Sequence, residues 1–172
     1  MTAFLLRMPA GIVGEPTRGF ANMVIEPQIV TPSGTTGAPT AYGVPMVVDT
    51  TSGNVGNMRT MVAADTAAYG VLIRPFPTGG APANSPLGSG STPPANGPCD
   101  IMKSGYVSVL LSGSTAAAKG GQVYIWTAAA SGTHIVGGFE ATNPSSNGIA
   151  YTGAYFTGPA DANAITEIAI NP

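Results

Sequence analysis

The side chains able to do acid–base or nucleophilic chemistry are few in this sequence of 172 residues, and two types occur only once. His134 is the single histidine and Cys99 the single cysteine, so a thiol mechanism would have to pair these two. Their spacing gives no reason for them to meet. His134 follows the turn-like sequence Ser-Gly-Thr, and Cys99 stands between a proline and an aspartate. We expect a histidine at the mouth of a strand and a small buried thiol rather than a catalytic pair.

The carboxylates are scattered singly along the chain. They are Glu15, Glu26, Asp49, Asp65, Asp100, Glu140, Asp161 and Glu167. A calcium-binding loop needs acidic residues at alternate positions, and no such run is present. A carboxylate pair of the glycosidase type stays open, although no particular pair is indicated. Asp161-Ala162-Asn163 is a weak candidate for an ion site, and we expect no bound metal.

Glycine-rich phosphate loops fail on inspection. Gly88-Ser-Gly-Ser91 lacks a third glycine and a following helix, and Lys119-Gly-Gly121 lacks the residue order of a P-loop. There is no Gly-x-Ser-x-Gly elbow. The sequence therefore predicts that the protein is not an enzyme and takes no cofactor. A solvent-lined cleft holding His134 together with a carboxylate would favour an enzyme instead.

The elements that position these residues are predicted to be short strands. Apolar or alternating segments recur between clusters of Gly, Pro and Asn, which is the pattern of a sandwich or small barrel. The segments are 23–25 and 28–30 on either side of Pro27, then 44–48, 69–74, 106–111, 122–126, 135–139, 154–156 and 167–170. Helical periodicity is not sustained anywhere, because glycines interrupt both alanine-rich pieces. We expect an all-β fold, a β-sandwich, jelly-roll-like or small barrel.

The core is predicted to lie in two of these strands. Alternation and apolar content point inward for Tyr106, Val107, Val109, Val123, Ile125 and Trp126. Trp126 and the tyrosines could instead stack on a sugar, but their place in strand patterns favours packing.

The chain is predicted to be one domain with two extended segments. Residues 1–20 contain Gly and Pro without a strand pattern and are expected to form an N-terminal arm. Residues 21–172 form the β-rich domain. Within it, 12 of the 24 residues from 75 to 98 are Pro or Gly, which predicts a long excursion. A split into two very small domains at that excursion is the alternative.

Charge excludes several classes of partner. Charged residues are 8% of the chain, the net charge is −2 and the mean hydropathy is +0.23. Six Lys and Arg residues are too few for a nucleic-acid surface, and no apolar run has the length of a membrane span. We find no secretory signal and expect the chain to stay in a cytoplasm after synthesis. A surface of Ser, Thr, Asn and Gly suits contact with other proteins, although a weakly charged free domain explains it equally well.

The second half of the chain carries an ordered series of short motifs. These are PCDIMKSGYVSV at 98–109, KGGQVYI at 119–125, GFEA at 138–141 and FTGPADA with EIAIN between 156 and 171, preceded by YGVLIRPF at 69–76. In this order, over roughly residues 40–171, the chain resembles the structural cement (head decoration) proteins of tailed bacteriophages.

The resemblance implies a β-sandwich or jelly-roll-like protein on the outer surface of the phage head, made in the host cytoplasm. It would bridge neighbouring capsomers of the major capsid protein, without a cofactor, and stabilise the head against DNA pressure. A homodimer or homotrimer is expected from lattice symmetry. The arm 1–20 and the excursion 75–98 are long enough to reach a neighbouring subunit. The alternative function is a carbohydrate- or receptor-binding β-sandwich module of a virion fibre.

Overall fold

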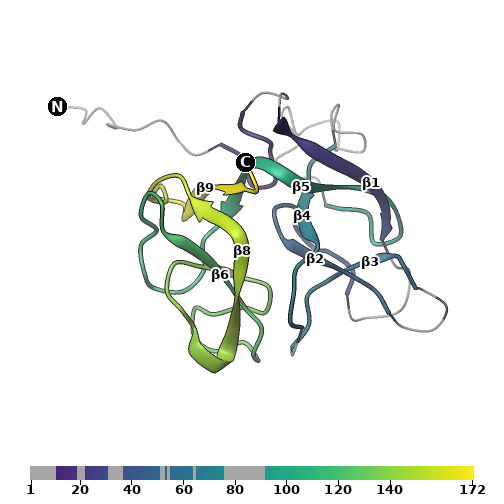
Figure 1. Cartoon of the computed structure of the whole chain (residues 1–172). Helices are drawn as coiled ribbons and strands as arrows, with labels where there is room; N and C mark the ends of the chain where they lie inside the picture. Colours follow the sequence, from purple (N-terminus) through teal and green to yellow (C-terminus); the bar gives the residue numbers. More distant parts are fainter. Residues whose placement is uncertain are drawn as a thin grey trace.

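The structure, a computed structural model, describes residues 11–18, 22–30, 37–50, 53, 55–63, 65–75 and 92–172. These residues form two β-rich units that lie side by side and share one long strand, β5 (Figure 1). The strands are β1 (Val24–Val30), β2 (Pro45–Val48), β3 (Met58–Thr60), β4 (Gly70–Ile73), β5 (Gly97–Leu110), β6 (Gln122–Trp126), β7 (Phe139–Glu140), β8 (Gly148–Phe156) and β9 (Ile165–Ile170). The predicted all-β fold is confirmed.

The first unit is a closed barrel of five strands. Its strands follow the order β1-β3-β2-β4-β5, and β5 pairs back onto β1 to complete the ring. The β1–β3 pair is parallel and the others are antiparallel. Pro27 lies inside β1 opposite Asp100, in a strand that also carries a register shift. Closure leaves this unit without the open edges on which sheets aggregate.

The second unit is a sheet with the order β5-β9-β8-β6-β7, and β5 passes into it directly from the barrel. Up to Ser104, β5 pairs with barrel strands, and from Gly105 onward it pairs with β9. Gly105 has φ +130°, a conformation that L side chains rarely adopt. A Cβ there would also lie 3.2 Å from the Met23 side chain. The glycine therefore lets one strand change partners without a break.

The core consists of two apolar clusters, and the larger of them joins the two units. Side chains on a strand alternate between faces, so Leu72 packs inside the barrel while its neighbours Val71 and Ile73 face outward. Those outward residues join a larger cluster with Val107 and Phe156 of the second sheet. Each fully buried side chain of this size contributes about 1.5–3 kcal/mol to stability. Because the larger cluster draws on both units, outward-facing barrel residues complete the core of the second sheet.

The core residues predicted from the sequence are mostly confirmed. Val107, Val109, Val123 and Ile125 have no exposed surface, and Trp126 is buried. The prediction for Tyr106 was wrong. Alternation turns its ring to the opposite face of β5 from Val107, where it is partly exposed.

The described part of the expected arm, residues 11–18, lies along β5. Gly14 N donates to Ser108 O at 2.7 Å, Ser108 N to Glu15 O at 3.0 Å, and Thr17 N to Tyr106 O at 3.0 Å. Gly14 has φ +83°, and a Cβ there would lie 2.5 Å from that of Tyr42. This segment therefore covers the edge of β5 that β9 leaves open. Residues 1–10, 19–20 and 76–91 of the arm and the excursion lie outside the described residues.

None of the helices in the described part of the chain is long and apolar enough to cross a bilayer.

Candidate functional site

One pocket gathers the single histidine, the single tryptophan and a carboxylate. It has a volume of about 210 Å³ and lies where β6 ends beside β7. Its lining residues are Ser112, Gly113, Ser114, Thr115, Trp126, His134, Glu140, Ala141, Thr142, Asn143 and Pro144. We call it the Trp126 pocket.

A tight turn brings His134 to the pocket. Ser131 and His134 exchange two backbone hydrogen bonds of 3.0 Å, and Gly132 within the turn has φ +58°. The imidazole stacks on Trp126 with ring centroids 4.3 Å apart and an interplanar angle of 19°. The Trp126 Nε1 donates to Ala129 O at 3.1 Å, which fixes the indole. His134 thus lies at a strand end, as predicted, and also lies over the tryptophan.

His134 and Glu140 form a close pair in this pocket. The Nδ1 of His134 lies 2.6 Å from Oε1 of Glu140, and their side chains are 33% and 5% exposed. Glu140 comes from β7, whose two residues pair with β6. A cleft that holds the histidine together with a carboxylate is the arrangement that would favour an enzyme, and this arrangement is present.

In the described part of the chain the pair nevertheless has no hydroxyl or thiol hydrogen-bonded to it, although Ser112, Ser114, Thr115 and Thr142 line the same pocket. Glu140 is the only described side chain that hydrogen-bonds to the imidazole. Cys99 is buried in the barrel cluster, away from this pocket, and burial raises the pKa of its thiol to about 11. A thiol with that pKa stays protonated near neutrality, so Cys99 has the structural role predicted for it.

The weak candidate for an ion site has a structural explanation. The Oδ1 atom of Asp161 accepts hydrogen bonds from the backbone N of Asn163 at 2.8 Å and of Ile165 at 2.9 Å. This arrangement closes the turn that leads into β9. Within the described ranges, no three His, Cys, Asp or Glu side chains are grouped as metal ligands would be.

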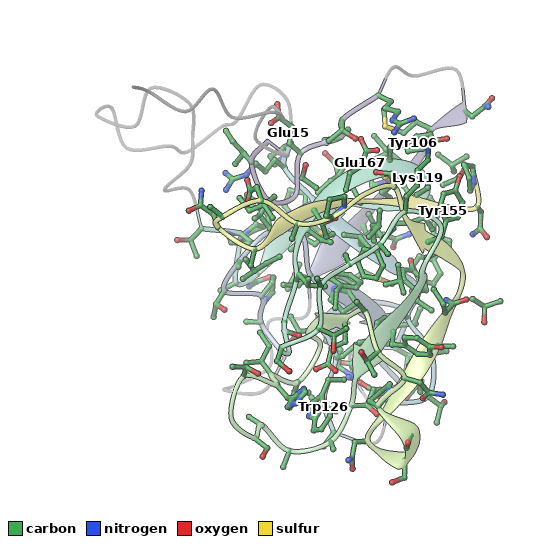
Figure 2. All side chains as sticks on the ribbon, turned by 90° about the vertical axis from the view of Figure 1, so that its left-hand side faces the viewer. Glu15, Tyr106, Lys119, Trp126, Tyr155 and Glu167 are labelled. Carbon is green, nitrogen blue, oxygen red and sulfur yellow. The ribbon has the colours of Figure 1, made fainter. Side chains whose placement is uncertain are left out.

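A second surface is a patch of tyrosines at the opposite end of the second sheet from Trp126 (Figure 2). Tyr106 on β5 and Tyr155 on β8 both pair with Ala169 of β9, so the small alanine lies between the two rings. The Arg18 guanidinium lies 4.2 Å from the centre of the Tyr106 ring. We call Thr17, Arg18, Tyr106, Tyr155 and Glu167 the tyrosine patch. Tyrosine and arginine are the residues enriched at protein–protein contacts.

The charges of the tyrosine patch are paired within it. Arg18 Nη2 lies 2.5 Å from Glu167 Oε1, and the Thr17 hydroxyl donates to Glu167 Oε2 at 2.5 Å. Burial alone would raise the pKa of Glu167, but hydrogen bonds from Arg18, Thr157 and Thr17 hold it below its ordinary value. The patch therefore offers aromatic and hydrogen-bonding groups to a neighbour with little unpaired charge.

A third surface is an apolar groove of about 540 Å³ between the two units. Its walls include Val13, Val44 and Met61 on one side and Leu110, Ile135 and Val136 on the other. Leu110 and Ile135 are 46% and 50% exposed, which is unusual for large apolar side chains that lie together. Sequence patterns missed this groove because its walls come from seven separate segments of the chain.

Comparison with known proteins gives a family and a fold. A family model described as "XM1 gp53 minor capsid protein" matches residues 1–170. One solved structure, described as "The capsid of Myoviridae Phage XM1", contains a chain that matches with a TM-score of 0.64 and 13% sequence identity. The match covers 98% of this chain and 94% of that chain. No curated protein matches the sequence.

Proposed function

Because the chain belongs to the XM1 gp53 minor capsid protein family, we propose that it is a cement protein that holds the phage head together. It binds the outer surface of the head and bridges neighbouring subunits of the major capsid protein. The family match over residues 1–170 is the observation that carries this proposal. It also confirms the resemblance to structural proteins of phage heads noted in the sequence.

Two separated surfaces support bridging. A protein that links two subunits needs two places of contact on one rigid body. The tyrosine patch and the Trp126 pocket lie at opposite ends of the second sheet (Figure 2). Two modest contacts made by the same molecule combine into a much larger avidity when both can form together. The arrangement therefore suits a link between neighbours better than attachment to a single subunit.

The scarcity of free charge supports a covered surface. Only 8% of the residues are charged. Three of the acidic residues are paired internally, Asp65 with Arg59, Glu140 with His134 and Glu167 with Arg18. Burying an unpaired charge at an interface costs roughly several kcal/mol, because the charge loses its contact with water. Surfaces of hydroxyl and aromatic groups avoid that cost. No catalytic activity is part of the proposal.

Residues 1–20 and 75–98 enter the proposal as the segments that reach adjacent subunits. Residues 14–17 are fixed along β5, so residues 1–10 are the part of the arm that we assign to contacts with a neighbour. Self-association as a dimer or trimer on the head also belongs to the proposal, because a bridging protein follows the symmetry of the lattice.

Undecorated heads provide the direct test. Purified protein is incubated with heads that lack it, and the heads are imaged by cryo-electron microscopy. We expect ordered density on the outer surface between capsomers, and heads that release DNA at a higher temperature than undecorated ones. Heads without added density at saturating protein, or density on the inner surface, would contradict the proposal.

A further inference from the structure

We propose that the Trp126 pocket binds a guanidinium group, the end of an arginine side chain supplied by a neighbouring protein. The assignment of that neighbour to the head rests on the proposed function, whereas the chemistry of the pocket does not. Three features of the pocket indicate this ligand. They are the buried carboxylate of Glu140, the open space in front of that carboxylate and the side chains that line the pocket around it.

The Glu140 carboxylate is buried, and only one of its two oxygens has a hydrogen-bond partner in the described part of the chain. Its Oε1 atom is taken by Nδ1 of His134, and within the described residues the carboxylate has no other hydrogen-bond partner. No described side-chain oxygen is both fully covered and without a partner, so Oε2 reaches the pocket. A carboxylate largely removed from water is stable only with donors or a positive charge beside it. A ligand with N–H groups and a positive charge supplies both.

Gly113 keeps the space in front of this carboxylate open. A Cβ on Gly113 would lie 3.4 Å from Cδ and 3.5 Å from Oε2 of Glu140, and 3.5 Å from Cε1 of His134. Any side chain at this position would therefore cover both polar groups. The glycine has φ +76°, so its conformation also disfavours a larger residue.

The walls suit a flat cation. The His134 ring stacks nearly parallel to the Trp126 indole and covers one face of it, so the flat, partly exposed imidazole is the surface on which a planar group can lie. The hydroxyl groups of Ser114, Thr115 and Thr142 line the rim and are exposed. A guanidinium carries five N–H donors in one plane and no acceptor, so one carboxylate oxygen and several hydroxyls match it. A volume of about 210 Å³ accommodates one side-chain end.

The fluorescence of Trp126 gives a clean measurement, because it is the only tryptophan in the chain. The full-length protein is titrated with N-acetyl-arginine amide and, separately, with the citrulline analogue, which has the same shape without the charge. We expect a saturable change in fluorescence with arginine and none with citrulline at the same concentration. Equal responses to the two, or a response only to a neutral sugar such as methyl glucoside, would overturn the proposal. This comparison uses the wild-type protein alone.

The variant Glu140→Gln removes the charge at constant shape. We expect its affinity for N-acetyl-arginine amide to fall at least about tenfold, because the charge-assisted hydrogen bond is lost. Glu15→Gln is the matched control, since Glu15 is exposed and lies outside the pocket; its affinity should equal that of the wild type. Unchanged affinity in a folded Glu140→Gln protein would overturn the proposal.

Binding to undecorated heads separates this inference from the proposed function. If the wild type decorates heads and Glu140→Gln does so less tightly, a neighbour on the head supplies the guanidinium. If both decorate heads equally, that assignment is wrong while the cement function stands. If arginine binds but the wild type never decorates heads, the cement function fails and the chemistry of the pocket stands.

Discussion

Ala169 shows how one small residue sets the chemistry of a surface. Its methyl group lies in register between Tyr106 and Tyr155, and the alanine is itself fully buried. A larger side chain would separate the two rings and lift Tyr106 away from the Arg18 guanidinium. Residues of this kind are invisible to motif searches, because alanine carries no functional group.

The ion pair of Asp65 with Arg59 makes the stability of the barrel depend on pH. Arg59 donates to both of its oxygens at 2.7 and 2.8 Å, and Val62 N donates at 2.7 Å. Burial alone would raise the pKa of Asp65, but these hydrogen bonds outweigh burial and hold the pKa below 3.8, the ordinary value for an aspartate side chain. A lowered folded-state pKa stabilises the protein above the ordinary pKa of the group, and this contribution is lost as the pH falls through the folded value.

We therefore expect Asp65→Asn to lower the free energy of unfolding at pH 7 by about 1–3 kcal/mol, because two charge-assisted hydrogen bonds are weakened. The difference from the wild type should shrink as the pH is lowered below 3.8. Urea denaturation at several pH values measures both effects. Glu15→Gln, at an exposed carboxylate, should leave the curve unchanged. A constant difference at all pH values would show that the charge of Asp65 is not the cause.

Among the strands, β5 belongs to both units, and its two faces differ in how far their side chains are buried. Val109 is fully buried in the larger apolar cluster, whereas its neighbour Leu110 is 46% exposed at the groove. Alternation along the strand produces this contrast within two adjacent positions.

Val109→Asp should unfold the protein, because it buries an unpaired carboxylate. The cost of several kcal/mol is roughly half or more of the free energy of unfolding of a typical domain. Leu110→Asp is the matched control and should remain soluble with a cooperative melting transition. Circular dichroism during heating measures both variants. A Val109→Asp protein that melts like the control would place Val109 outside the core.

The N-terminal segment gives a second test at this scale. Its described hydrogen bonds to β5 come from residues 14–17, so removal of residues 1–10 should leave the melting temperature unchanged while weakening decoration of heads. Removal of residues 1–18 should instead lower the melting temperature, because it uncovers the buried Ser108 and the edge of β5. If the shorter deletion decorates heads with unchanged affinity, the contact assigned to residues 1–10 is wrong.

The sequence predicted the class of elements better than their extents. Strong apolar segments gave β2, β4, β6 and β9 nearly as observed. β3 was missed, because three residues with a central arginine carry no periodic signal. β5 was predicted too short, because Pro98 and Gly105 indicate breaks although both lie within the strand. The segment 135–136 forms a turn before β7, where Gly137 has φ +77°.

The candidate site was less predictable than the fold. His134, Trp126 and Glu140 are near one another in the sequence, yet only the turn at Gly132 and the pairing of β6 with β7 bring them into contact. The sequence indicated His134 as a candidate for acid–base chemistry, because it is the single histidine, but it did not indicate which carboxylate would pair with it. Pairings of this kind depend on strand register, which short strands specify weakly.

For the whole molecule, the shared core predicts a single unfolding transition. The barrel and the second sheet have β5 in common, and the larger apolar cluster contains residues of both. Trp126 reports on the second sheet and Cys99 on the barrel. We expect tryptophan fluorescence and thiol labelling to give the same denaturation midpoint. Two separate midpoints would show that the units unfold independently.

The course of β5 through both units has a mechanical consequence. Its barrel half is flanked by β1 and β4, and its second half by β9 and residues 14–17. The bonds of antiparallel pairs run perpendicular to the strands. Tension that draws the two units apart along β5 therefore loads whole rows of these bonds in shear, so that they share the strain and do not open one after another. A force applied between the two units is therefore opposed by many hydrogen bonds at once.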